Sequence, residues 1–108
     1  MFAVIYSGKI KAGYEEKYQK YWHIIAEFFV THCGALGSCL HKTSDGSWLA
    51  YSRWPDKATR DAVFLEENRK TLPVEIQNTF QSFSECILEQ APEICLEVID
   101  DLLLQQAE

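Results

Sequence analysis

The sequence lacks the features that mark several large classes of protein. No apolar stretch approaches the roughly 18–20 residues needed to span a bilayer, and no run of five or more like charges occurs. Ten basic against sixteen acidic residues give a net charge of −6, so no basic patch is present to attract phosphate backbones or anionic lipids. We therefore expect neither nucleic acid nor a membrane as a partner.

The four cysteines do not form a metal-binding or redox motif. The four cysteines contain no C-x-x-C pair and no Cys/His cluster with zinc-finger spacing, so we expect no metal site; they are Cys33, Cys39, Cys86 and Cys95. The apolar N-terminus lacks the positive region that precedes a secretion signal. Reduced thiols in a cytoplasmic protein are therefore the expectation, with a disulfide as the lesser alternative. P-loops, acyl-transfer triads and paired catalytic carboxylates also find no pattern.

What the chain does have is length for one domain and many aromatic residues. Its 108 residues suit a single domain over 1–108, and aromatics make up 13%. A small domain uses aromatic residues either as bulky core filling or to line a pocket, and composition leaves both open.

The first half of the sequence alternates between strand and helix signals. Phe2 to Lys11 alternates as a strand with one fully apolar face, and Gly13 ends it. A helix follows as far as His32 or Cys33, with an inward stripe at about 100° per residue; the stripe is Tyr14, Tyr18, Trp22, Ile25, Phe29 and His32. Two further strands, 36–43 and 47–54, flank an Asp-Gly turn that is typical of a hairpin.

The second half predicts helices followed by a last strand. Asp56 is a suitable N-cap for a helix starting near Lys57, and a clean apolar stripe predicts a longer helix from Pro73 to Glu89. Pro92 cannot continue that helix, and Ile94 to Leu104 reads as a final strand, although its end could equally be helical.

The resulting order, β-α-β-β-α(α)-β, predicts an α+β class: a ferredoxin-like split βαβ domain with a four-stranded antiparallel sheet. Helices would cover one face of the sheet. The reverse face would expose Ile5, Leu49 and Tyr51, so we predict a homodimer that buries this open face against a second copy.

Several short motifs, in this order, resemble the antibiotic biosynthesis monooxygenase (ABM) domain family of the dimeric α/β-barrel superfamily. They are the opening FAVIY strand, KAGYEEKY at the helix entry, GAL at the next strand entry and SRWPDKA at the strand–helix junction. Together they cover residues 2 to about 65, and the remainder matches in element order alone. The resemblance implies a dimeric barrel with a pocket between sheet and helices. Some relatives oxygenate aromatic polyketides or quinols without metal or flavin, others degrade heme, and many have no established activity.

The resemblance and the strand pattern together name candidate site residues. Trp54 matches the aromatic that ends the third strand in the family, and Tyr6 falls where heme-degrading members place an asparagine. We predict Trp54, Tyr6 and His32 as catalytic residues, and a substrate-binding set of Trp22, Phe29, Ser52 and Phe80. The alternative is that Trp54 and Tyr6 are core aromatics and that His32 is structural. Heme-degrading members of the family have a histidine ligand on the second helix, about ten residues after the tryptophan that ends the strand. Phe64 occupies that place here, so we do not expect heme, and we expect no other cofactor.

Arg53 should point to the face opposite Trp54 if the strand is regular. It would then pair across the dimer interface with a carboxylate such as Glu97, or clamp an anion. The acidic pairs Glu66-Glu67 and Asp100-Asp101 read as solvated.

The leading hypothesis is a cofactor-independent monooxygenase-like protein acting on a small aromatic, phenolic or quinol substrate. The alternative is a non-catalytic ligand-binding or scaffold dimer with the same fold. A cavity larger than about 300 Å³ between sheet and helices would favour the enzyme; side chains filling that space would favour the alternative.

Overall fold

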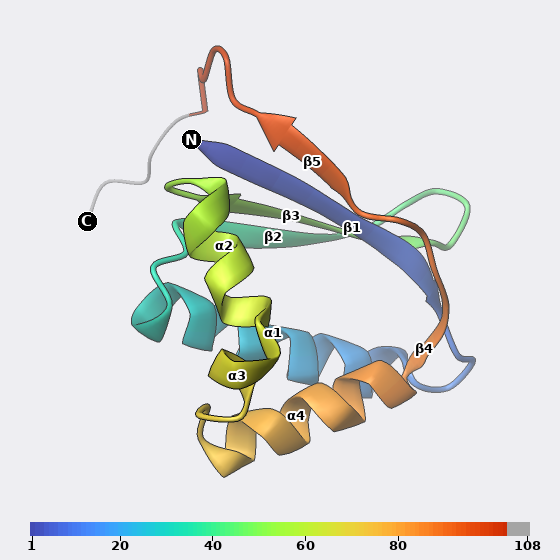
Figure 1. The fold of residues 1–108 in the computed structure, drawn as a ribbon. Coiled ribbons are helices and arrows are strands. Elements are labelled where there is room, and N and C mark those ends of the chain that lie inside the picture. The colour runs from blue at the N-terminus through green and yellow to red at the C-terminus, as the bar shows by residue number, and fades with distance from the viewer. Residues whose placement is uncertain (104–108) are drawn as a thin grey trace.

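The computed structural model describes residues 1–103 and has two layers, a sheet with its helices on one side (Figure 1). The elements are β1 (Phe2–Ile10), α1 (Glu15–His32), β2 (Gly37–Lys42), β3 (Trp48–Trp54), α2 (Lys57–Phe64), α3 (Glu66–Arg69), α4 (Val74–Glu85), β4 (Ile87–Gln90) and β5 (Ile94–Glu97). The predicted ferredoxin-like α+β class is confirmed. No helix within these described residues is long and apolar enough to cross a membrane.

The sheet is antiparallel and β1 lies at its centre. Its order is β2-β3-β1-β4, with β5 also pairing with β1. On one side, β1 pairs with β3 from Phe2↔Trp54 to Gly8↔Trp48. On the other side, β4 pairs with the end of β1 near Gly8 and β5 with the end near Phe2. The fourth strand of the split βαβ arrangement is therefore divided into two short strands.

Local signals start and end several elements, among them the predicted Asp-Gly turn and the predicted N-cap Asp56. Gly46 in the hairpin and Gly34 after α1 have φ angles of +87° and +82°, which a residue without a Cβ adopts at little cost. Asp56 caps α2 by accepting a 2.8 Å hydrogen bond from the backbone N–H of Thr59. These signals lie within a few residues of what they control, so the sequence alone reveals them.

The predicted helix from Pro73 to Glu89 is too long. The structure ends α4 at Glu85, and Ile87, which continues the helical stripe in the sequence, pairs instead with Ile10 of β1. Pairing with a distant strand overrides the local periodicity, because β1 offers unpaired backbone groups that must be satisfied.

The predicted final strand, 94–104, is also wrong in its extent. The structure places β5 at 94–97 and separates it from β4 by residues 91–93. Pro92 has no N–H for the ladder with β1, and proline within a sheet is confined to edges and breaks. Leu104 lies outside the described residues.

The core fills the space between the sheet and the helices. One cluster of buried residues joins Phe2, Val4, Ala35 and Trp54 and packs against Phe29. A second joins the Tyr18, Trp48 and Cys86 side chains. All four cysteines are free thiols.

The stripe of α1 faces the core in the middle of the helix, but its last member does not. Tyr18 and Ile25 are buried, whereas His32 is exposed and stacks on Phe28 with ring centroids 4.8 Å apart. The inward direction predicted for His32 is therefore wrong. Periodicity identifies the side of a helix that packs, but it does not show how far along the helix the packing partner extends.

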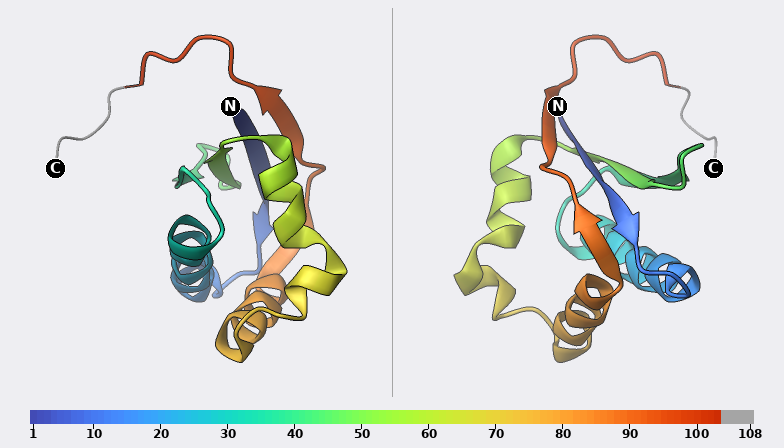
Figure 2. Two further views of the ribbon diagram at one scale, coloured as in Figure 1. Left: turned by 60° about the vertical axis from the view of Figure 1, so that its left-hand side comes forward. Right: turned by 90° about the vertical axis from the view of Figure 1, so that its right-hand side faces the viewer.

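The other face of the sheet is partly covered by the chain itself. The segment after β5 arches past the N-terminal end of β1 (Figure 2). There it lies beside Tyr51 and Arg53 of β3, and Asp101 forms a 2.8 Å ion pair with Arg53. Asp101 is exposed, as predicted, but it is paired, and Arg53 pairs with it rather than with Glu97. The pairing arises because the segment after β5 folds back beside Arg53. On the same face, Ile5, Leu49 and Tyr51 are half-buried.

Candidate functional site

A cavity of about 170 Å³ lies between the sheet and helices α1, α2 and α4. Five of the seven predicted site residues line it: Tyr6, Trp22, Phe29, Ser52 and Phe80. The structure does not bring the other two to the cavity. Trp54 lies in the core, and His32 is exposed.

The volume of the cavity limits what it holds. It is smaller than the roughly 300 Å³ that we set as the threshold for an enzyme pocket. An apolar cavity of about 150 Å³ nevertheless accommodates a benzene molecule. The site in this conformation therefore fits one aromatic ring, and the volume argues against a polycyclic ligand.

Phe29 of α1 is central to the cavity wall. Its ring centroid lies 5.7 Å from that of Trp54, 5.9 Å from that of Phe64 and 5.8 Å from that of Phe80. These distances are typical of aromatic pairs that attract each other beyond their buried area. The wall therefore contains mutually supporting rings from α1, α2 and α4, suited to a flat apolar ligand.

Trp54 lies behind this wall. Its side chain is 1% exposed, and its indole Nε1 is buried without a hydrogen-bond partner among residues 1–103. Phe29 lines the cavity, and Trp54 packs against Phe29 without lining the cavity itself. The catalytic role predicted for Trp54 stays a prediction, and the position of the indole suits packing.

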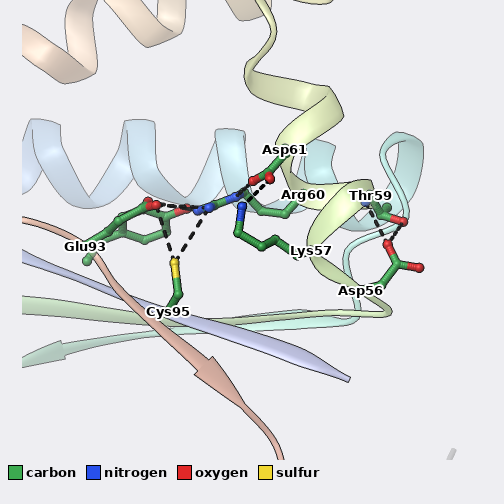
Figure 3. A network of polar contacts seen from close by, with 8 residues as sticks. Asp56, Lys57, Thr59, Arg60, Asp61, Glu93 and Cys95 are labelled. Carbon is green, nitrogen blue, oxygen red and sulfur yellow. Dashed lines mark hydrogen bonds and ion pairs between the residues drawn. The ribbon is translucent and has the colours of Figure 1, made fainter.

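Arg60 of α2 is 5% exposed and was not among the residues predicted from the sequence. Figure 3 shows its guanidinium between Asp61 of its own helix and Glu93 and Cys95 of the edge segment. The ring centroid of Phe64, which lines the cavity, lies 5.8 Å from the guanidinium carbon. Arg60 therefore sits directly behind one part of the cavity wall.

All five N–H groups of Arg60 have partners. Nε donates to Asp61 at 2.8 Å, one terminal nitrogen donates to Glu93 at 2.8 Å and to the Tyr6 hydroxyl at 2.9 Å, and the other donates to Glu93 at 3.0 Å and to Cys95 Sγ at 3.9 Å. A buried arginine is tolerated where its charge is paired and its donors are satisfied. This one is held in a single orientation.

The hydrogen bond to Tyr6 has a defined direction. Arginine carries donors and no acceptor, so the Tyr6 oxygen accepts and the phenolic hydrogen is not used by Arg60. Burial raises the pKa of the Tyr6 phenol, although the hydrogen bond from Arg60 opposes that rise. Tyr6 is therefore protonated at neutral pH. It can act as a hydrogen-bond donor and is a poor base.

The charges around Tyr6 are fixed by the same contacts. Burial works to lower the pKa of the Arg60 guanidinium, but the hydrogen bonds to Glu93, Asp61 and Tyr6 outweigh it, so the pKa is raised. The hydrogen bond from Arg60 lowers the pKa of Glu93. Lys57, and then Arg60, lower the pKa of Asp61. At neutral pH the two cations and two carboxylates balance.

The rest of the lining offers few polar groups. Ser38 Oγ donates a 2.9 Å hydrogen bond to Ser52 Oγ, and burial raises the pKa of Tyr18, the second phenol on the lining, to about 12. Over residues 1–103, no histidine, carboxylate or lysine lines the cavity, and no cluster of three potential metal ligands occurs. The site is therefore an apolar slot with hydroxyl donors.

Arg60 could not be placed from sequence. Its helix has no clear apolar face, and Glu93 is 33 positions away in an irregular segment that reads only as a helix end. The one local signal is that a charged residue occupies the α2 turn nearest the end of β3. A charged residue in such a position is much more often exposed to solvent than buried in an ion pair.

The fold and the cavity define a class: a ferredoxin-like α+β domain with an aromatic-lined cavity between sheet and helices. No protein-family model matches the chain, and no curated protein matches it in sequence. Solved structures share the fold over nearly the whole chain, and several carry the name antibiotic biosynthesis monooxygenase. The fold prediction and its resemblance to structures of this kind are confirmed.

Three of these structures show the extent of the likeness. A protein from Chloroflexus aurantiacus J-10-fl, provisionally named an antibiotic biosynthesis monooxygenase, has a TM-score of 0.73 at 11% identity, over 93% of this chain and 94% of that one. Rv0793 from Mycobacterium tuberculosis has a TM-score of 0.69 at 14% identity, over 94% and 98%. SnoaB, a cofactor-independent oxygenase from Streptomyces nogalater, has a TM-score of 0.68 at 12% identity, over 94% and 95%. At these identities the likeness establishes the fold alone.

Proposed function

We propose that this protein is a cofactor-independent monooxygenase-like enzyme acting on a small, single-ring phenol or quinol. The observation that carries the proposal is the cavity: a slot of one-ring size, lined by aromatic side chains, with the Tyr6 phenol fixed at its wall by Arg60. The likeness to SnoaB supports the chemistry, since that protein is a cofactor-independent oxygenase on the same fold.

The reaction draws its electrons from the substrate. A quinol anion passes one electron to dioxygen, and the semiquinone and superoxide then combine to form a C–O bond. Loss of water leaves a hydroxyquinone. One oxygen atom enters the ring and the other leaves as water, so a hydroquinone C₆H₆O₂ and O₂ give C₆H₄O₃ and H₂O. Such a sequence needs a dry, shaped site.

The proton of the quinol must leave without a protein base. The described part of the lining contains no imidazole or carboxylate, and the exposed His32 lies outside it. We therefore expect the quinol to ionise in water before it is enclosed, which favours substrates that are acidic enough to be partly ionised at working pH. Tyr6 then donates a hydrogen bond to the ring oxygen.

The test is oxygen consumption by the wild-type protein with a panel of hydroquinones of increasing size. One-ring hydroquinones should give protein-dependent oxygen uptake with a hydroxyquinone product, and three-ring analogues should give none, because the cavity of about 170 Å³ excludes them. Uptake with the large analogues alone would contradict the size argument. No protein-dependent uptake with any member would contradict the proposed activity.

One observation favours a second candidate, a non-catalytic ligand-binding or scaffold dimer. The cavity is smaller than the roughly 300 Å³ of a typical ligand pocket, and the Phe29 ring packs against the Phe80 and Trp54 rings between the layers. In that case one-ring aromatics would bind and remain unchanged in air.

We also propose that two copies associate through the face of the sheet opposite the helices. Ile5, Leu49 and Tyr51 lie there half-buried, and the tail beside them carries Ile99 and Leu102, which are exposed. Contiguous exposed apolar surface of this kind marks interaction sites on soluble proteins. Light scattering at micromolar concentration should give the mass of two 12.5 kDa chains; the mass of one chain would contradict the proposed dimer.

A further inference from the structure

Tyr6 is a cavity-lining phenol that accepts a hydrogen bond from Arg60, whose other N–H groups are paired with Asp61, Glu93 and Cys95. We propose that Tyr6 donates a hydrogen bond to the oxygen of the bound ring, and that the Arg60–Glu93 pair behind it sets how acidic that bound phenol is. Arg60 is then a positioning residue, and Glu93 adjusts its effect. This inference rests on the proposed ligand class and adds the groups that select it.

The direction of the hydrogen bonds supports the first part. The guanidinium can only donate, so the Tyr6 oxygen accepts at 2.9 Å and its hydrogen stays available to a ligand. Hydrogen bonds in a chain strengthen one another, because each donor is polarised by the one behind it. An arginine behind Tyr6 thus makes the phenol a stronger donor than an unassisted tyrosine.

The burial of the cluster supports the second part. Arg60 is 5% exposed and its charge is poorly screened, whereas the Glu93 side chain is 42% exposed. Glu93 forms two hydrogen bonds to the guanidinium, at 2.8 and 3.0 Å, and cancels part of its field at the cavity. Removing Arg60 and neutralising Glu93 should therefore have opposite effects on a negatively charged ligand.

Tyr18 provides an internal contrast. It also lines the cavity, but its ring stacks on Phe83 and meets the edge of Trp48. Burial raises the pKa of the Tyr18 phenol, and the nearby thiol of Cys86 raises it further. No cation supports the Tyr18 hydroxyl among the contacts of residues 1–103, so we assign the ligand contact to Tyr6.

The probe for the test is 4-nitrophenol, a one-ring phenol whose ionised form absorbs visible light and whose protonated form does not. Titration with pH in the presence of excess protein gives the pKa of the bound phenol directly. The ligand is not oxidised in this measurement, so the result does not depend on oxygenase activity. 4-Nitrotoluene, which has the same shape without the phenolic oxygen, serves as the ligand control.

The variants are Arg60→Met, Glu93→Gln and, as a matched control from the opposite face of the sheet, Arg53→Met. We expect Arg60→Met to raise the pKa of bound 4-nitrophenol by about one unit, a tenfold loss of preference for the anion, and Glu93→Gln to lower it by a comparable amount. Arg53→Met should leave it at the wild-type value. If the two substitutions only loosened the fold, the pKa of bound 4-nitrophenol would not shift in opposite directions in the two variants.

Other outcomes overturn the inference. Equal bound pKa values in all variants would remove the Arg60–Glu93 pair from the site, and shifts of the same sign would reduce it to a structural role. If Arg60→Met does not fold, the Glu93→Gln shift alone decides, because glutamine can still accept from Arg60. Binding of 4-nitrotoluene as tight as that of 4-nitrophenol by the wild type would remove the Tyr6 contact. Failure of oxygen uptake together with the predicted shifts would refute the proposed activity and leave this inference standing.

Discussion

Replacing Tyr6 with phenylalanine should lower kcat/KM for oxygen uptake with one-ring hydroquinones by about ten- to a hundredfold, because a hydrogen bond to an ionised oxygen contributes about 1.5–3 kcal/mol. The substitution keeps the ring that packs in the wall and removes the hydroxyl that Arg60 holds. Because the donor acts on the charged form of the substrate, we expect most of the loss in kcat/KM. Oxygen-electrode kinetics on the purified protein measure it.

The control for this prediction is Tyr14→Phe, which makes the same change on an exposed residue outside the cavity. It should leave uptake unchanged. We expect thermal unfolding to show that Tyr6→Phe is folded. The substitution removes one acceptor from Arg60, but Glu93 still binds the guanidinium. Wild-type turnover by Tyr6→Phe, or loss of turnover in Tyr18→Phe instead, would show that the donor has been assigned to the wrong residue.

Replacing Trp54 with alanine should lower the free energy of unfolding by about 4 kcal/mol, near the upper part of the range for large-to-small changes in cores. Its side chain is 1% exposed and packs among Phe2, Val4 and Phe29, so the change leaves a cavity that the aromatic wall cannot fill without moving. Urea unfolding at neutral pH, followed by circular dichroism, measures the loss.

Two further variants separate packing from chemistry at Trp54. Trp22→Ala removes the same side chain from a half-buried position on the cavity wall and should cost clearly less. Trp54→Phe should also cost less than its lost area implies, because it removes the buried Nε1 hydrogen that has no partner, and such a group is itself unfavourable. If Trp54→Phe keeps its stability but loses oxygen uptake, Trp54 has the catalytic role that the sequence predicts.

The candidate site shows where sequence reasoning succeeds and where it ends. Strand alternation placed Tyr6 and Ser52 on the helix-facing side of the sheet, and helical periodicity placed Trp22, Phe29 and Phe80 toward it; all five line the cavity. Periodicity failed for His32, which is exposed in the last turn of α1. It also did not distinguish residues that line the cavity from those that pack behind it, as Trp54 does.

The amino-acid sequence by itself determined the element order, the hairpin, the caps and the buried face of each long element, because these depend on residues a few positions apart. Only the tertiary structure decided that Ile87 joins a strand, that the edge strand divides at residues 91–93 and that Glu93 meets Arg60. It also decided the cavity volume, which depends on how side chains from four elements fill one space. Such contacts join residues 33 to 77 positions apart, and no local pattern encodes which distant partner completes a strand or neutralises a buried charge.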